Sequence, residues 1–409
     1  MFGQHHPQNA AMVMTMKILM LSDVYFPRVN GVSTSIAHFR RELQAQGHEV
    51  WLIAPDYLAA EADPRILRLP ARVVPFDPED RIMSPRRLRQ LLPRLKELSF
   101  DLLHVHTPFS AHYAGTWLAR QLGVPCIETY HTFFEAYGAH YFPWLPKSWL
   151  RAGTRWLSRR QGNAVDGLIA PSRAMADALA GYGVKTPIEV IPTGIQPSEM
   201  HCGDGAALRR RLEILPEQPT MVFVSRIAHE KNLGFLLSVV ERLRARIPEL
   251  RCLIAGAGPA AGWLRTEVNR RGLSEIVILL GNLSRQGELQ SCYRAGDVFV
   301  FPSRTETQGL VLLEAMAAGV PVVGMAAMGA ADVLGPQRGC RVAADDVEDF
   351  ADRSLELLQN RELRARIAEE AVQYADEWSA PAMAERLAAF YRRVLAGHGR
   401  LVETSPVSS

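Results

Sequence analysis

The chain has 409 residues, of which 48% are hydrophobic and 22% are charged. At roughly 150 residues per domain, this length predicts two or three domains, and the hydrophobic fraction is enough to give each a buried core. The composition excludes a disordered or collagen-like chain. Lys and Arg number 46 against 43 Asp and Glu, and this net charge of +3 excludes the strong overall field of a dedicated nucleic-acid-binding protein.

The five cysteines are widely spaced and none belongs to a Cys-x-x-Cys pair, so we expect neither a disulfide framework nor a zinc site. No basic stretch precedes the first apolar residues and Lys17 interrupts them, which argues against a secretory signal. The longest uncharged run, 315–331, is rich in Ala and Gly and contains Pro321. It predicts a helix, a turn and a strand, not a membrane-spanning helix. These features favour a cytoplasmic protein.

The first half of the chain alternates between short apolar runs and longer amphipathic stretches, a pattern typical of repeated βαβ units. A glycine turn that contains Gly31 follows the first run, and a helix is predicted to begin near Ser33. Buried parallel strands are predicted over 17–22, 49–54, 102–106, 126–130 and 167–170. We therefore expect an α/β fold with a doubly wound sheet.

Residues 196–219 lack a regular period, and Pro, Gly and a short charged helix predominate there, so we place an inter-domain linker in this range. The alternating pattern then resumes, with strands predicted over 221–225, 251–255, 276–280, 298–301 and 320–323. This restart predicts two Rossmann-like domains, 1–194 and 195–379. Such sheets bind ligands beyond the carboxyl ends of their strands, so we expect the active site in the cleft between the domains.

The end of the chain has helical spacing over 347–376 and 380–395, with no strand between the two segments. The tail 397–409 is expected to be disordered.

The stretch 301–323 predicts a strand, a polar loop and a helix. Backbone amides at a helix start after a glycine turn bind anions, so Gly309 and Leu310 form a candidate diphosphate site. Glu306 and Glu314, separated by seven residues, are poor phosphate ligands but good acceptors for the hydroxyl groups of a hexose and a ribose. The alternative is that Glu306 is a solvated loop residue and Glu314 a charge favoured by the helix dipole.

Two cations, Arg226 and Lys231, follow the first strand of the second domain. Arg offers a fork of donors and Lys a point charge, so both are candidates to bind a leaving diphosphate. The alternative is that both are ordinary surface cations. The glycine-rich turn that begins at Gly256 differs in spacing from a dinucleotide fingerprint, and no acidic residue ends the following strand. A nicotinamide-dependent enzyme is therefore disfavoured.

The Arg, the Lys, the Gly-x-Gly-Pro turn and the two Glu residues occur in the order that is found in retaining glycosyltransferases of the GT-B fold. The second domain resembles theirs, and the resemblance covers nearly the whole chain. It implies two Rossmann-like domains that face a central cleft, with Gly256 beside the donor. It also implies a last helix, about 380–396, that crosses back to complete the first domain.

The same resemblance implies the roles of the donor-site residues. The two cations would bind the diphosphate with support from Gly309 and Leu310, Glu306 would hold the transferred sugar, and Glu314 would hold the ribose. Similar enzymes need no metal for the leaving group. We therefore expect neither a metal nor a cofactor, because the nucleotide sugar is a co-substrate.

Strand ends of the first domain contain four histidines that are expected to face the same cleft: His104, His106, His131 and His140. They lie in two loops without a carboxylate at ligand spacing, which argues against a metal site. His131 is the candidate catalytic residue, because similar enzymes have a functional histidine in this His-Thr pattern; the alternative is a packed neutral ring. In similar enzymes the turn at Gly31 faces the donor phosphate and the acceptor; the alternative is a plain strand-to-helix turn.

Residues 86–160 contain 11 Lys and Arg against four Asp and Glu. Basic helices with Trp and Leu on another face bind in the headgroup layer of anionic membranes. Trp149 and Trp156 are seven residues apart and share one helix face. We expect membrane or acceptor contacts from Trp144, Trp149, Arg151, Arg155 and Trp156. The alternatives are that the tryptophans belong to the core, or that the zone binds nucleic acid, for which no known motif is present.

Within the family, the segments around His106, His131 and Glu306 most resemble bacterial diacylglycerol glycosyltransferases, although Phe133 and Phe134 replace the residues expected there. The expected function is retaining transfer of a hexose from a nucleotide sugar, UDP-glucose foremost, to a membrane lipid such as diacylglycerol. The protein would be peripheral on the inner membrane face, without a nucleic-acid partner. Three alternatives stay open: transfer of mannose from GDP-mannose or of another hexose to a different lipid or a soluble glycan, a GT-B-like nucleotide-sugar epimerase, and a non-catalytic nucleotide-sugar-binding protein.

Overall fold

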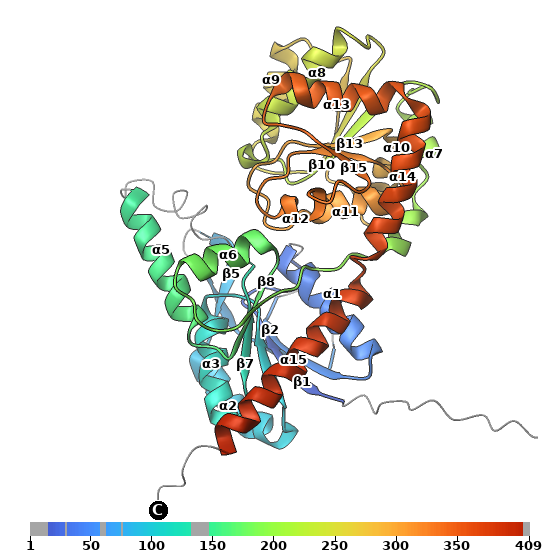
Figure 1. The fold of residues 1–409 in the computed structure, drawn as a ribbon. Helices are drawn as coiled ribbons and strands as arrows, with labels where there is room; N and C mark the ends of the chain where they lie inside the picture. The colour runs from blue at the N-terminus through green and yellow to red at the C-terminus, as the bar shows by residue number, and fades with distance from the viewer. Residues whose placement is uncertain (1–14, 29–30, 58–62, 75–76, 132–146, 404–409) are drawn as a thin grey trace, which may run out of the picture.

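The computed structural model describes residues 15–28, 31–57, 63–74, 77–131 and 147–403, which form two α/β domains (Figure 1). In the first domain, the described residues form a seven-stranded parallel sheet of order β3-β2-β1-β6-β7-β8-β9. Its strands are β1 (Lys17–Leu21), β2 (Glu49–Pro55), β3 (Ile66–Leu69), β6 (Leu102–Val105), β7 (Cys126–Thr129), β8 (Gly167–Ala170) and β9 (Ile188–Val190). A separate antiparallel pair consists of β4 (Ala71–Val74) and β5 (Asp77–Met83).

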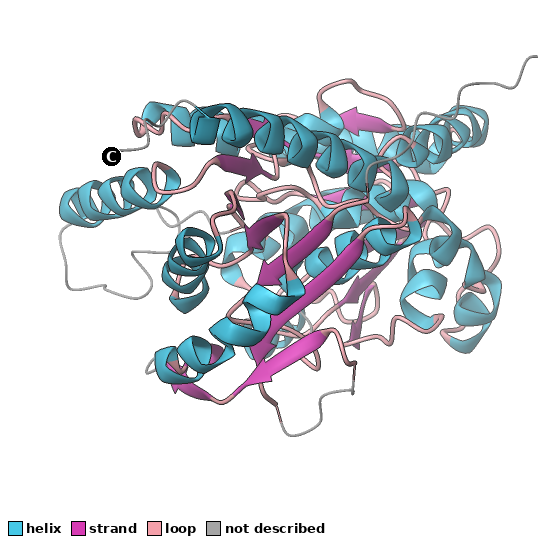
Figure 2. Ribbon diagram, turned by 90° about the horizontal axis from the view of Figure 1, so that it is seen from below, coloured by secondary structure: helices cyan, strands magenta, loops and turns pink. Residues whose placement is uncertain are grey.

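Helices cover both faces of this sheet, which Figure 2 shows as a layer between them. They are α1 (Gly31–Ala45), α2 (Pro85–Leu98), α3 (Ser110–Leu122), α5 (Lys147–Gly162), α6 (Arg173–Gly181) and α15 (Ala380–Glu403). Side chains alternate along each strand, so each face has its own core. In β1, Ile18 and Met20 pack with α1 and α15, whereas Leu19 and Leu21 pack with α2, α3 and α6.

The second domain has a parallel sheet of six strands among the described residues, in the order β12-β11-β10-β13-β14-β15. The strands are β10 (Thr220–Val224), β11 (Arg251–Ala255), β12 (Val277–Gly281), β13 (Val298–Phe301), β14 (Val322–Gly324) and β15 (Cys340–Val342). Around them lie α7 (Gly205–Arg211), α8 (Leu233–Arg244), α9 (Ala261–Arg270), α10 (Glu288–Ala295), α11 (Leu310–Ala317), α12 (Ala330–Leu334), α13 (Val347–Gln359) and α14 (Arg361–Asp376). Two Rossmann-like sheets confirm the predicted fold class.

The ten predicted strands are all present, with ends no more than two residues from those expected. Parallel strands that are covered on both faces are almost wholly apolar, which is why short apolar runs identified them. The sequence did not reveal β3, β9 and β15, which have three or four residues each and lie at sheet edges. Such short strands leave too little pattern to recognise.

The crossing between the domains is shorter than the predicted linker. Residues 197–211 form the 3-10 helix η1 (Pro197–Cys202) and α7, and Met200 and Leu208 are buried in the core of the second domain. The prediction of a linker over 196–219 is therefore wrong for most of that range, whereas the short charged helix predicted within it is confirmed as α7. Two short helices that each bury about one apolar residue do not produce a visible period.

The last helix returns to the first domain, as the resemblance implied. Met383, Leu387 and Tyr391 of α15 are buried against the first sheet beside α1 (Figure 1). The helix continues to Glu403, so the expected disorder is wrong for 397–403, and 404–409 lie outside the described residues. A glycine inside an established helix costs only about 1 kcal/mol relative to alanine, so Gly397 and Gly399 do not end it.

Candidate active site

The candidate site lies where the strand order reverses, between β1 and β6 in the first sheet and between β10 and β13 in the second. Ligands bind beyond the carboxyl ends of strands at such switch points. The loops after these strands contain most of the predicted residues. The backbone N–H of Arg173 on α6 donates to the Asp332 carboxylate on α12 at 2.5 Å, so helices of the two domains are in direct contact.

The loop after β10 places Arg226 through contacts with the glycine turn after β11. Gly256 has φ +133°, and a Cβ at this position would lie 1.8 Å from the Ser225 carbonyl oxygen. The Ile227 N–H donates to the Ala257 carbonyl at 3.0 Å. Gly256 is thus required for close packing against the Arg226 loop. The Arg226 side chain is exposed beyond the strand end.

Lys231 and Glu306 form the central ion pair of the second domain's strand ends. Lys231 ends the 3-10 helix η2 (His229–Lys231), and its Nζ donates to Glu306 Oε2 at 2.6 Å. Both side chains are mostly buried. Asn232 Nδ2 donates to the Pro302 carbonyl at 3.1 Å and ties the two loops together. The predicted phosphate ligand and the predicted sugar ligand are therefore neighbours.

The loop after β13 ends at the helix start that the sequence predicted, with Gly309 buried and Leu310 partly exposed. Gly309 is the N-cap of α11 with φ +87°, a left-handed conformation that favours glycine, and Leu310 is the first helical residue. On the other side of the loop, the Gly329 N–H donates to the Glu306 carbonyl at 2.8 Å, and a Cβ on Gly329 would lie 2.0 Å from the Thr307 carbonyl oxygen. The backbone around Glu306 is thus fixed from both ends.

Glu314 lies on α11 and is buried. Its carboxylate accepts from Arg285 Nη2 at 3.0 Å and from the Tyr293 hydroxyl at 2.7 Å. The Glu314 charge raises the pKa of the Arg285 guanidinium, and burial raises the pKa of Tyr293 further above its usual value, so both partners keep their protons. Glu314 lies outside the first turn of α11, so the alternative that it is an amino-terminal charge favoured by the helix dipole is wrong. Arg285 and Tyr293 were not foreseen, because no motif marks them.

His104 in β6, His106 directly after it and His131 after β7 lie in a row. His104 and His106 are fully buried, so the prediction that they face the cleft is wrong, and His131 alone of the three is partly exposed. His104 contacts the hydroxyls of Tyr391 at 2.6 Å and Thr129 at 2.7 Å, and its ring centroid lies 4.0 Å from that of His106. His106 Nδ1 lies 3.4 Å from His131 Nε2. Burial lowers the pKa of His104 to about 3 and that of His131 to about 4. His131, the partly exposed residue of the three, is therefore neutral near pH 7.

His140 lies outside the described residues. Among the residues that are described, no three His, Cys, Asp or Glu side chains are grouped as metal ligands.

Asp23 is a buried carboxylate after β1 that sequence analysis did not select. It accepts from Thr107 Oγ1 at 2.8 Å, from the Ser110 hydroxyl, and from the Ala111 N–H at 3.0 Å. Burial raises its pKa to about 6, against the lowering effect of these hydrogen bonds. Asp23 thus joins the end of β1 to the start of α3. This link depends on the pairing of β1 with β6, which the sequence alone does not show.

Gly31 is the first described residue after a gap at 29–30 and begins α1. No atom lies within 4 Å of the position that a Cβ would take. Packing of the described residues therefore does not require glycine at this position. Its predicted approach to the donor stays a prediction.

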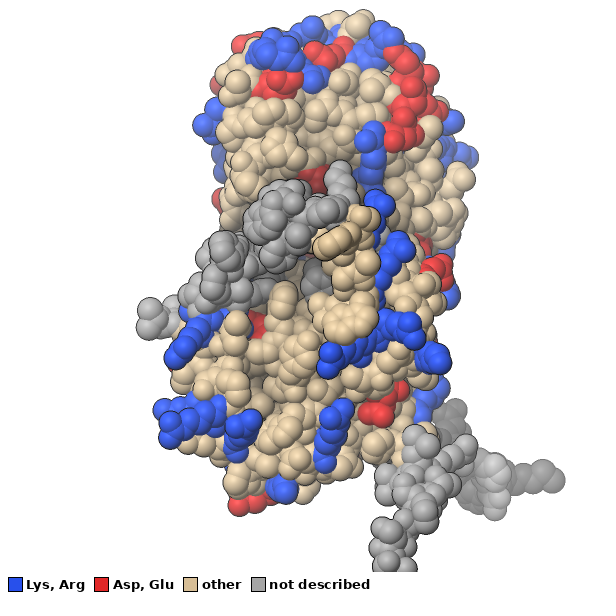
Figure 3. Space-filling view, turned by 90° about the vertical axis from the view of Figure 1, so that its left-hand side faces the viewer, with Lys and Arg blue, Asp and Glu red and all other residues tan. Residues whose placement is uncertain are grey.

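Helix α5 exposes the tryptophans that the sequence placed on one face. The Trp149 and Trp156 side chains are 72% and 60% exposed, so the alternative that they belong to the core is wrong. Arg151 and Arg155 are exposed on the same helix, and Trp144 lies outside the described residues. In Figure 3, basic side chains predominate on the first domain, whereas both signs mix on the second. None of the described helices combines the length and apolar character needed to span a bilayer.

Comparison with known proteins identifies both domains. Residues 29–199 match the family Glycosyltransferase Family 4, and residues 205–374 match Glycosyl transferases group 1. The alpha-monoglucosyldiacylglycerol synthase of Streptococcus pneumoniae is 35% identical to this chain over 319 residues, which are 75% of this chain and 70% of that protein. A GDP-mannose-dependent alpha-mannosyltransferase of Corynebacterium glutamicum is 29% identical over 82% of this chain and 78% of that protein.

Among solved structures, Anabaena HepE in complex with UDP superposes with a TM-score of 0.73, covering 92% of this chain and 100% of that chain. The sequence identity is 17%, so this likeness concerns the fold. Both domains, the relatives and the fold thus agree with the motifs. The chain belongs to the GT-B glycosyltransferases of family 4 and group 1.

Proposed function

We propose that the enzyme transfers a hexose from UDP-glucose to a membrane lipid acceptor such as diacylglycerol, with retention of configuration. The main observation in support is the Lys231–Glu306 ion pair at 2.6 Å, which lies in the loops beside the amino terminus of α11. A cation for phosphate and a carboxylate for sugar hydroxyls are adjacent there. The relative named alpha-monoglucosyldiacylglycerol synthase supports glucose as the sugar and diacylglycerol as the acceptor.

The leaving group would be bound by charges of the second domain. Arg226 and Lys231 would stabilise the diphosphate as the bond to the anomeric carbon breaks, assisted by the amides of Gly309 and Leu310. Glu306 would hold sugar hydroxyls while it remains paired with Lys231. Glu314 would accept from the ribose beside Arg285 and Tyr293. This set supplies the positive charge that the reaction needs, so the proposal includes neither a metal nor a cofactor.

Configuration at the anomeric carbon would be retained because the acceptor attacks the same face of the sugar from which the leaving group departs. The carboxylates of Asp23, Glu306 and Glu314 are each held by neighbouring donors, which disfavours a covalent glycosyl-enzyme intermediate. In front-side attack the acceptor oxygen bonds to the anomeric carbon, the bond from that carbon to the phosphate oxygen breaks, and a phosphate oxygen takes the acceptor proton. Neutral His131 would hydrogen-bond a sugar hydroxyl.

The first domain would bring the enzyme to the cytoplasmic face of the membrane. Trp149 and Trp156 would enter the headgroup layer, and the surrounding arginines would bind anionic headgroups. Helix α2 adds exposed cations at Arg86, Arg87, Arg89, Arg94 and Lys96. The protein would therefore be peripheral, with its acceptor delivered from the bilayer.

The test is release of nucleoside diphosphate from UDP-glucose and GDP-mannose, with and without anionic liposomes that contain diacylglycerol. Release that requires UDP-glucose and the lipid supports the proposal. Release from GDP-mannose would favour the second candidate, mannosyl transfer, which the mannosyltransferase relative supports. Release that is indifferent to lipid would place the acceptor in solution. Interconversion of nucleotide sugars without release of nucleoside diphosphate would indicate an epimerase. Binding of a nucleotide sugar without any reaction would indicate a non-catalytic binding protein.

A further inference from the structure

The two chain crossings between the domains lie side by side. The Ile195 N–H donates to the Trp378 carbonyl at 3.0 Å, and the Ala380 N–H donates to the Ile195 carbonyl at 2.7 Å. A Cβ on Gly194 would lie 2.4 Å from Ala380 Cα, so the two crossing segments are too close for any side chain at position 194. Any relative movement of the domains has to be accommodated at this paired crossing.

A glutamine of the donor loop binds the first crossing directly. Gln308 Oε1 accepts from the Thr193 N–H at 2.8 Å, and Gln308 Nε2 donates to the Thr193 carbonyl at 2.6 Å. The Gln308 side chain is buried. Its amide thus pairs with one residue's backbone as a neighbouring strand would. Gln308 lies two residues after Glu306 and directly before Gly309, so it belongs to the loop that would hold the donor.

Residues 191–195 form the first crossing, the linker between the domains. Thr193 of this linker also contacts the first domain. Thr193 Oγ1 donates to Ser35 Oγ on α1 at 2.9 Å, and both residues are buried. One residue further, the Gly194 carbonyl lies 3.0 Å from His38 Nδ1 of the same helix. A continuous row of hydrogen bonds therefore runs from α1 through the linker to the donor loop.

An amide is the side-chain group that matches this position. It presents one donor and one acceptor, whereas a carboxylate would place two acceptors against the Thr193 carbonyl and a leucine would leave both backbone groups without a partner. Buried backbone groups without partners are rare in folded proteins. The pairing therefore constrains the linker and the loop to move together.

We propose that Gln308 is a positioning residue that couples the orientation of the two domains to the placement of Glu306 and Gly309. This inference rests on the proposed function, since it assigns the regulation of the same donor site. Closure of the cleft would move the linker at Thr193, and Gln308 would carry that movement into the loop. Donor binding would in turn restrain the linker.

The test compares Gln308→Leu with the matched variant Gln218→Leu. Gln218 also pairs with two backbone groups, Leu215 N at 3.1 Å and Glu249 O at 2.8 Å, but inside the second domain and away from the cleft. Hydrogen exchange is measured for peptides covering 191–195, with and without saturating UDP, and UDP affinity by calorimetry. In the wild type and in Gln218→Leu, UDP is expected to slow this exchange at least about threefold.

In Gln308→Leu, exchange at the linker is expected to be fast and insensitive to bound UDP, with UDP affinity within about threefold of the wild type. The kcat is expected to fall at least about tenfold while the donor KM changes little. Unchanged linker exchange, or a wild-type linker that ignores bound UDP, would overturn the proposal. A parallel loss of UDP affinity and kcat would also overturn it, because it would reduce Gln308 to a support of the loop.

A second variant covers the case in which the leucine variant does not fold. Gln308→Glu presents one donor and one acceptor when protonated, so its relative kcat should rise as pH falls from 8 to 6, unlike that of Gln218→Glu. No such rise would contradict coupling through this pair of hydrogen bonds. The exchange measurement needs no turnover, so absence of transfer in the wild type would defeat the proposed function and still leave the coupling tested.

Discussion

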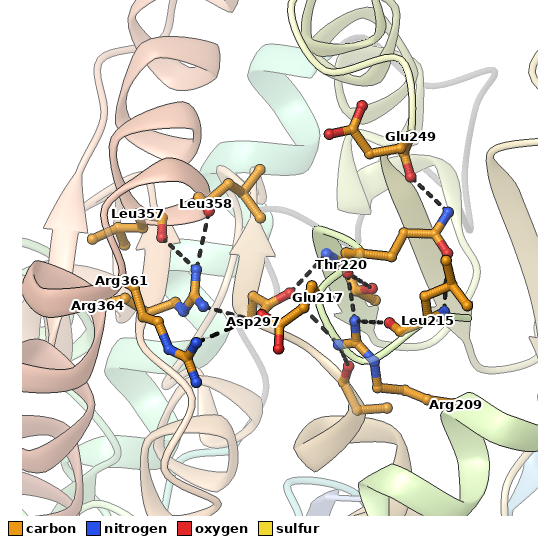
Figure 4. Close-up of polar contacts among 12 residues, drawn as sticks. Arg209, Leu215, Glu217, Thr220, Glu249, Asp297, Leu357, Leu358, Arg361 and Arg364 are labelled. Carbon is orange, nitrogen blue, oxygen red and sulfur yellow. Dashed lines mark hydrogen bonds and ion pairs between the residues drawn. The ribbon is translucent and has the colours of Figure 1, made fainter.

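Both ends of the second sheet contain buried or partly buried charged residues, but the cations at the two ends differ in how many protein partners they have. At the amino ends of the strands, Asp297 lies between Arg209 and Arg364 and accepts from the Thr220 N–H at 2.9 Å (Figure 4). These arginines also donate to backbone carbonyls, those of Leu215, Gln218, Ala295, Leu357 and Leu358.

At the carboxyl ends, the cations have few partners. Among the described residues, Arg226 has no hydrogen bond or ion pair, and Lys231 pairs with Glu306 alone. A cation enclosed by carbonyls stabilises the fold, because its Nη donors bind protein acceptors and not a ligand. A cation at the switch point keeps its donors for a substrate. The partners of a charged residue, more than its type, separate structural from functional positions.

The largest expected effect is that of Lys231→Ala. Loss of one cation at the leaving group should lower turnover by a factor of about 100 or more, because that charge acts mainly as the bond breaks. The variant should still fold, but its melting temperature should fall, because Glu306 loses its partner in a mostly buried ion pair. Steady-state release of nucleoside diphosphate and thermal denaturation measure the two quantities. Near-normal turnover would remove Lys231 from the proposed site.

The corresponding substitution at the amino ends of the strands is Asp297→Ala, which tests a structural position and not a functional one. Without this carboxylate, Arg209 and Arg364 lose their shared partner and the Thr220 N–H loses its acceptor, so the variant should be less stable by about 1–3 kcal/mol. Its turnover below the unfolding transition should equal that of the wild type. If activity fell while stability did not, the contrast between the two ends would be wrong.

A smaller effect is expected from the double substitution Trp149→Ala and Arg155→Ala on α5. Sedimentation with anionic liposomes should decrease several-fold, because an exposed aromatic anchor and a cation are removed together. Trp263→Ala is the matched control, since Trp263 is also exposed but lies on α9 of the second domain. Equal sedimentation of the double variant and the wild type would exclude this face of α5 as the membrane contact.

The last prediction concerns the pH dependence of stability that arises from His131, which is expected without any change near pH 7. Its folded pKa of about 4 lies below the unfolded value near 6.5, so the unfolded chain binds more protons between these values. Stability is fully present above about pH 6.5 and is lost as pH falls toward 4, by up to about 1.4 kcal/mol per pH unit from this residue. The melting temperature of His131→Asn should therefore depend less on pH in this range. The same pH dependence as in the wild type would show that His131 titrates normally.

Much of the fold followed from the sequence because both sheets are parallel and covered on two faces. The proximity of Lys231 to Glu306 was also predictable, since each follows a strand at a switch point. In contrast, the Arg285–Glu314 and Tyr293–Glu314 contacts join separate elements through side chains whose directions depend on packing. Gln308 was missed for a related reason, because its partner is a backbone and leaves no sign in the sequence.

The return of α15 to the first domain also sets an order of events during synthesis. One face of the first sheet, with Ile18 and Met20 of β1, is covered by Met383, Leu387 and Tyr391, which are translated more than 350 residues later. The first domain to emerge from the ribosome is thus the last to be completed, and its apolar face has to wait while the whole second domain is made. Such an interval of exposure is where a folding chaperone would find this chain.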